Sequence, residues 1–123
     1  MTLIDWQIIG KGDGSGDLVP FLFANLDIVL RRAHEDDLIR RYFDAMQAQG
    51  VGYEHFEDQM IGLRYGLMFW MIAWGNTCVT AVSVNERAEA LFEHVMARIT
   101  SAAKDHRPWE LIGDYSWSPT HLS

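Results

Sequence analysis

The sequence has a single cysteine among its 123 residues, Cys78. One cysteine cannot form a disulfide within the chain, so no covalent cross-link is expected to hold the fold, and a cytoplasmic location is the natural expectation. Cys78 lies in an apolar stretch, and we expect a buried side chain there rather than a reactive thiol.

Basic residues are also scarce: 10 lysines and arginines face 17 acidic residues, and the formal net charge is -7. Nucleic acids and anionic membrane surfaces both attract proteins through a basic face, so neither is expected as the main partner. Long hydrophobic runs are missing too. The most apolar stretch is "LMFWMIAW" (67–74), whereas a helix that spans a bilayer needs about 20 apolar residues.

Several catalytic motifs are absent. None of the 5 histidines stands at a recognised metal-binding spacing. The glycine-rich segment "GKGDGSG" (10–16) lacks the Gly-Lys-Ser/Thr ending of a phosphate-binding P-loop. The acidic run "HEDD" (34–37) is interpreted as a helix N-terminus, where carboxylates interact favourably with the helix dipole.

What the sequence does have is helical periodicity. Apolar residues recur at spacings of three and four and predict a mainly α fold of about four helices, preceded by a short β-strand. Asp17 is the expected N-cap of the first helix, and Gly50 is the expected stop signal after the second. The expected elements of this single domain are a strand at 3–9, a glycine-rich loop to 16, helices at about 17–32, 35–49, 53–74 (extending to about 82) and 85–106, and a tail, 107–123, packed on the bundle.

The first twenty residues carry a more specific pattern. Ile4-Asp5-Trp6 lies in the predicted strand, the Gly/Asp-rich loop follows, and Asp17-Leu18 opens the first helix. This order resembles one segment of the aminoglycoside phosphotransferase and choline-kinase-like superfamily, including its ecdysteroid-kinase-like branch. The resemblance covers about residues 2–100 and implies a fold similar to part of a kinase-like C-lobe.

The resemblance also implies roles for acidic residues. Asp5 corresponds to the aspartate that holds the nucleotide-bound metal, Mg²⁺ or Mn²⁺, and such hard cations prefer oxygen ligands. Asp17 corresponds to an acid at the helix start that braces the catalytic loop. Asp13 and Asp17 are the natural co-ligands of Asp5 because the glycines let the loop fold back. For Asp17 the simpler interpretation, a helix N-cap, is preferred.

In that superfamily the catalytic loop and the nucleotide-binding lobe come before the Ile-Asp-Trp strand. This sequence has no glycine-rich phosphate cover, no ATP-anchoring lysine, no catalytic-base aspartate and no second metal-binding asparagine. Phosphoryl transfer needs several such parts held together. We therefore expect no nucleotide site and no kinase activity from this chain alone.

The expected role is that of a truncated, self-associating C-lobe domain. The strand would present unpaired backbone groups, and residues 67–74 are apolar on every side, so a homodimer is predicted with contacts at Ile4, Trp6, Trp70 and Trp74. A plainer alternative makes 67–74 a central helix wrapped by the others. Two other functions stay open: a metal-dependent phosphate-ester hydrolase with its site around Asp5, at a dimer interface in one version, and a subunit that complements a separately encoded kinase N-lobe.

Overall fold

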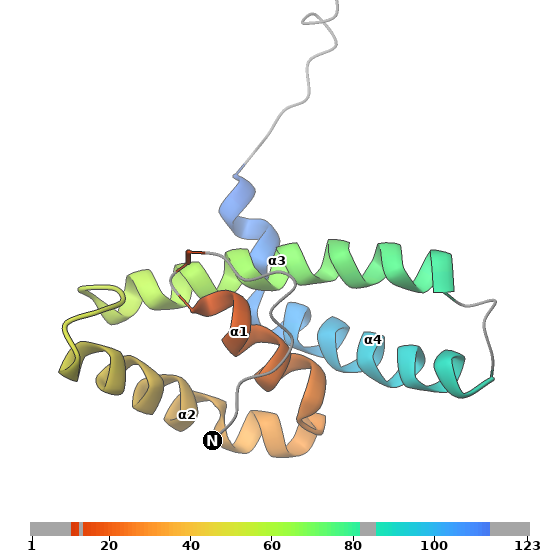
Figure 1. Ribbon diagram of the computed structural model, residues 1–123, viewed down its shortest axis with the longest axis horizontal. Coiled ribbons are helices and arrows are strands. Elements are labelled where there is room, and N and C mark those ends of the chain that lie inside the picture. Colours follow the sequence, from red (N-terminus) through yellow and green to blue (C-terminus); the bar gives the residue numbers. More distant parts are fainter. Residues whose placement is uncertain (1–10, 13, 82–85, 114–123) are drawn as a thin grey trace, which may run out of the picture.

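A computed structural model describes residues 11–12, 14–81 and 86–113, and this part of the chain is mainly helical, as predicted. Figure 1 shows α3 and α4 running antiparallel beside each other, with α1 against α3 and α2 leading away from the centre. The predicted strand at 3–9 lies outside the described residues. The elements are α1 (Ser15–Val19), the π-helix η2 (Pro20–Asn25), α2 (Ile28–Ala48), α3 (Phe56–Ala81), α4 (Glu86–His106) and the 3₁₀ helix η3 (Pro108–Ile112).

Helix α1 begins at a glycine, not at an aspartate. Gly14 is the N-cap, with a left-handed φ of 80°, and its carbonyl accepts a bond of 3.1 Å from the backbone N–H of Asp17. A Cβ at position 14 would collide with the Tyr42 hydroxyl, so glycine suits both the conformation and the space. Asp17 lies in the first turn and makes no side-chain cap bond. The prediction of Asp17 as N-cap was therefore wrong.

The predicted continuous helix over 17–32 was also wrong. Pro20 has no N–H to donate, and from this residue the chain continues as the π-helix η2 rather than as an α-helix. The helix then stops at Leu26, whose ψ of 141° is extended. Arg98 of α4 donates to the carbonyl oxygens of Ala24 and Asn25, at 3.1 and 3.2 Å, and so satisfies the end of η2.

The second helix begins earlier than predicted. Asp27 is its N-cap, because the carboxylate accepts from the backbone N–H of Val29 at 2.9 Å. The expected break near 33–35 does not exist, and residues 34–37 lie inside α2 rather than at a helix N-terminus. The helix therefore begins at the favourable cap, Asp27, and not at the acidic residues 34–37.

The later boundaries follow the predictions. Helix α2 ends at Ala48, and Gly50 takes the positive φ, 68°, of a stop signal. Helix α3 does continue past Gly75, to Ala81. Helix α4 ends at His106 ahead of Pro108. No helix in the described ranges is long and apolar enough to cross a membrane.

The core lies where α1 and η2 meet α3 and α4. Helix η2 lies in this space and supplies some of the most buried side chains. The fully buried apolar side chains include Val19, Leu22, Phe23, Ile39, Leu63, Leu67 and Ile99.

Candidate interaction surface

The predicted metal ligands are not brought together by the described part of the chain. Asp5 and Asp13 lie outside it, and Asp17 is exposed in the first turn of α1. Among the residues that the structure describes, no group of three or more His, Cys, Asp or Glu side chains is placed to hold a metal ion. The metal site therefore remains a prediction from the resemblance.

Of the predicted contact residues, Ile4 and Trp6 also lie outside the described residues. Trp70 and Trp74 are half-buried and pack against the core. The Trp70 indole N–H donates to the carbonyl oxygen of Gly16 at 2.7 Å, and the two indole rings meet edge to face at 5.5 Å. This face of α3 is thus engaged with α1.

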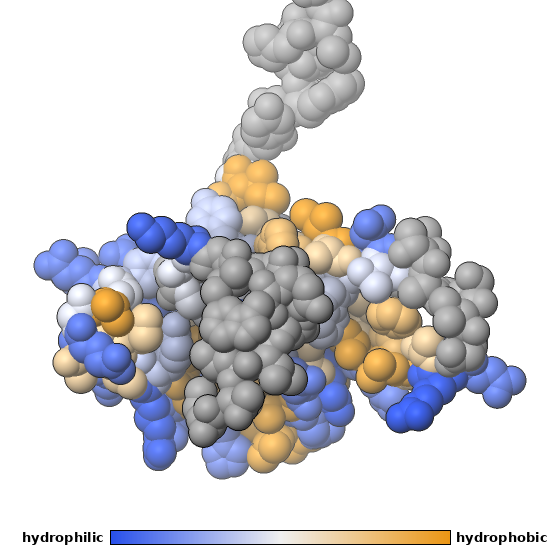
Figure 2. Space-filling view, viewed as in Figure 1, coloured by the Kyte–Doolittle hydropathy of each residue, from blue (hydrophilic) through white to orange (hydrophobic). Residues whose placement is uncertain are grey.

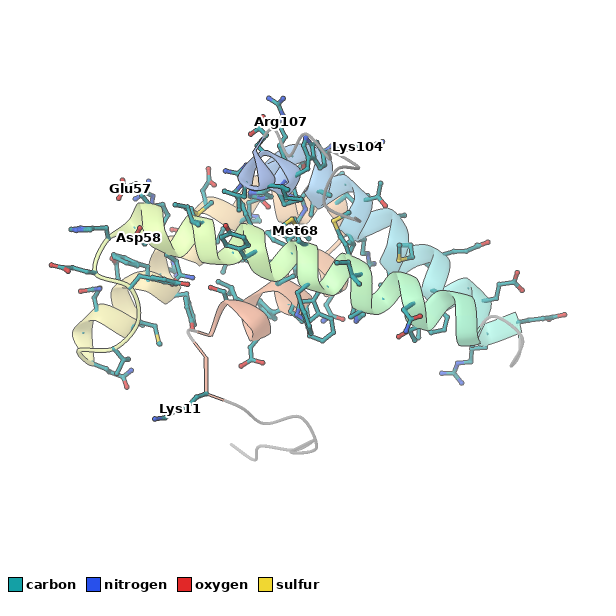
Figure 3. The ribbon with its side chains drawn as sticks, turned by 90° about the horizontal axis from the view of Figure 1, so that it is seen from above. Lys11, Glu57, Asp58, Met68, Lys104 and Arg107 are labelled. Atoms are coloured by element: carbon teal, nitrogen blue, oxygen red, sulfur yellow. The ribbon has the colours of Figure 1, made fainter. Side chains whose placement is uncertain are left out.

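The opposite face of α3 is exposed and apolar. Figure 3 shows α3 lying across the molecule with no other described element in front of it. Four side chains, spaced by four, four and three residues, form one stripe along this side. We call them the outer stripe of α3: Ile61 (42% exposed), Tyr65 (53%), Phe69 (63%) and Ile72 (75%).

The outer stripe also lacks charge. The sequence has no Asp, Glu, Lys, Arg or His from residue 65 to residue 81. A helix that faces water normally carries charged side chains on its solvent side, so an uncharged, aromatic outer face is typical of a surface that another molecule covers. The contacts predicted in this segment were the tryptophans, Trp70 and Trp74, and the outer stripe was not predicted. The signal that marks it is the long interval without charge, read together with the spacing.

A cluster of charged side chains joins α2 to α4. Arg31 is 1% exposed, and its guanidinium pairs with Glu35 at 2.5 Å and with Asp105 of α4. Arg32 pairs with the same Asp105 at 2.9 Å. His106 lies 3.3 Å from Glu35 and packs its ring on Phe23, with the ring centres 4.9 Å apart. We call Arg31, Arg32, Glu35, Asp105 and His106 the α2–α4 ion network.

The ion network lowers the pKa of both of its carboxyl groups. The hydrogen bond from Arg32 is the main cause for Asp105, with Arg31 adding to it, and the pKa of Asp105 falls to about 2. Burial by itself opposes ionisation of Glu35. Hydrogen bonds from His106 and Arg31 outweigh that burial and lower the pKa of Glu35 below its ordinary value. These ionised carboxylates pair across the two helices and hold α2 against α4, so the cluster has a structural role, and we call it the clamp.

Comparison with family models, with curated proteins and with solved structures finds no match for this chain. The phosphotransferase resemblance accordingly stays a prediction from the residues quoted for it. The outer stripe of α3 is the feature of the described structure that points most directly to a function.

Proposed function

We propose that this chain is a phosphotransferase-like C-lobe domain that works by association rather than by catalysis, and that its partner is a second copy of itself. The outer stripe of α3 carries the proposal. It presents four large apolar side chains on a helix face that no described element covers.

Charge favours this face over others as the place of contact. The chain has a net charge of -7, so two copies repel each other at most approaches. The side of α3 from Tyr65 onward carries no charge, and its burial therefore requires no ion to lose its water. Two like-charged copies can meet there at the lowest electrostatic cost.

The test is the mass of the full chain in solution, measured by light scattering or sedimentation over a wide range of concentrations. We expect a dimer that dissociates on dilution. Ile72→Glu should make the protein monomeric, because it places a carboxylate at the most exposed residue of the covered stripe. Val29→Glu on α2 is the matched control, since Val29 is 76% exposed against 75% for Ile72. It should leave the dimer intact.

Three outcomes would contradict the proposal. A wild-type chain that is monomeric at every concentration removes the association. Hydrolysis of a phosphate ester with Mg²⁺ or Mn²⁺ that is lost in Asp5→Asn would instead support the metal-dependent hydrolase. ATP turnover that appears only when a kinase N-lobe is added would support the complementing subunit, and the Ile72→Glu variant shows whether that lobe uses the same face.

A further inference from the structure

The exposed apolar surface does not end at the edge of α3, because η3 is fixed beside it. The Arg64 guanidinium of α3 donates to the carbonyl oxygen of Arg107 at 2.7 Å and pairs with the Glu110 carboxylate at 3.2 Å. Arg107 pairs with Glu110 as well, at 2.9 Å, and Pro108 is buried. These contacts hold η3 in one position on α3 and leave some of its side chains facing outward.

Two of those outward side chains are large and apolar: Trp109 is 48% exposed and Ile112 is 58% exposed. Figure 1 shows η3 rising past α3 on the side away from α1 and α2. In Figure 2 hydrophobic residues lie at the top of the molecule, where Figure 1 places η3, and others lie near them, with paler and hydrophilic residues alongside. The outer stripe of α3 and the η3 pair, Trp109 and Ile112, therefore lie on adjoining elements, and we call the two together the corner, with the stripe as its floor and the η3 pair as its wall.

We propose that this corner receives α3 of a second copy, packed antiparallel about a two-fold axis, so that each copy's α3 lies on the other's outer stripe and alongside the other's η3. The inference rests on the self-association proposed above and specifies its geometry. A two-fold contact uses the same patch on both copies, and a floor with a single wall is self-complementary in this way, because each wall flanks the other copy's helix.

Charge along α3 selects the antiparallel arrangement. Glu57 and Asp58 lie in the first turn of α3, and Figure 3 shows them at one end of the helix, with Met68 near its middle. A parallel pair would bring these four carboxylates together. An antiparallel pair places each acidic end beside the partner's uncharged end, and it also sets the helix dipoles in opposite directions. Both terms favour the antiparallel pair.

The wall is tested with Ile112→Glu in the full chain, and Leu91→Glu on α4 is the matched control, at 61% exposure against 58% for Ile112. A carboxylate inside a buried contact costs a good part of the binding energy. We expect Ile112→Glu to raise the dissociation constant of the dimer by about tenfold or more, and Leu91→Glu to leave it unchanged. Circular dichroism should show both variants as helical as the wild type.

The orientation is tested with spin labels on single cysteines, Asp58→Cys and Asn76→Cys, in a Cys78→Ser background. In an antiparallel dimer the two copies labelled at the same site lie far apart, on the order of 27 Å from eighteen residues at 1.5 Å rise. A mixed dimer, with one copy labelled at each site, should give the shortest distance. A parallel dimer reverses this order.

The outcomes separate the two proposals. A dimer that Ile72→Glu breaks and Ile112→Glu leaves unchanged overturns the corner and keeps the association. Same-site labels closer than mixed labels overturn the antiparallel packing. A wild-type chain that stays monomeric overturns both. A raised dissociation constant for the Ile112→Glu dimer, together with the shortest distance between mixed labels, supports the inference in full.

Discussion

The two faces of α3 carry the same kind of side chain and have opposite surroundings. On the inner face Leu63 and Leu67 are fully buried, and Trp70 is tied to α1 through Gly16. On the outer face Phe69 and Ile72 remain 63% and 75% exposed. The apolar character of this helix therefore completes the core on one face only, and we propose that the other face receives a partner.

Leu67→Ala and Ile72→Ala separate these two faces most strongly. Leu67→Ala removes fully buried methyl groups and leaves a cavity, so we expect about 3 kcal/mol of lost stability. Ile72→Ala, measured at a concentration where the chain is monomeric, should cost less than about 0.5 kcal/mol. Urea unfolding followed by circular dichroism gives both values. Equal losses in dilute protein would mean that the outer face is covered within the monomer.

Arg31 and Arg41 allow a buried and an exposed charged side chain to be compared in the same way. Arg31 is buried in the ion network, whereas Arg41 is 76% exposed and pairs with Asp37 at 2.8 Å. Arg31→Met leaves two carboxylates without their shared partner and should cost about 3 kcal/mol. Arg41→Met breaks a surface pair and should cost about 0.5 kcal/mol or less. The free energy of unfolding at neutral pH is the measurement, and similar values for both variants would contradict a buried clamp.

Acid should weaken the clamp before it affects the outer stripe. The folded-state pKa of Asp105 is depressed to about 2 from an ordinary 3.8. The stabilisation from such a group is present above its unfolded pKa and is lost as the pH falls toward its folded pKa. Stability should therefore decline between about pH 5 and pH 2, and Glu35, whose pKa is also lowered, acts in the same direction.

Asp105→Asn is the control for this pH dependence. The variant should be less stable than the wild type at neutral pH and should lose less on acidification, because it has no carboxyl group to protonate at this position. Urea midpoints at several pH values between neutrality and pH 2 provide the comparison. Parallel curves for the two proteins would show that Asp105 does not contribute through its ionisation.

The sequence predicted elements better than it predicted boundaries and faces. The α-rich fold and the ends of α2, α3 and α4 follow from periodicity and from stop signals such as Gly50. The start of the second helix was misplaced because both Asp27 and the acids at 34–37 are plausible helix starts in the sequence. Only the hydrogen bond from the Val29 N–H to Asp27 shows that the helix begins after Asp27. The pairing of Arg31 with Asp105 could not be predicted, since the two residues are 74 positions apart in the chain.

The exposed face of α3 could not be predicted from the sequence for a different reason. Residues 67–74 are apolar all round, so periodicity could not say which side of the helix faces inward. The position of α1 decides it, because α1 covers the tryptophan side. The predicted contacts at Ile4 and Trp6, and the predicted ligands Asp5 and Asp13, lie outside the described residues and stay predictions.

A single hydrogen bond contributes to holding the inner face of α3 in place, and its removal should have a modest effect. Trp70→Phe keeps an aromatic ring and removes the indole N–H that donates to Gly16, so it should cost about 1 kcal/mol. Trp74→Phe is the matched change, because Trp74 is half-buried in the same way and makes no hydrogen bond within the described residues. Both variants lose similar ring area, and the difference between their unfolding free energies isolates the bond. If the two are equally destabilised, packing alone holds α1 on α3, and the orientation of the helix that leaves the outer stripe exposed is fixed by shape rather than by this hydrogen bond.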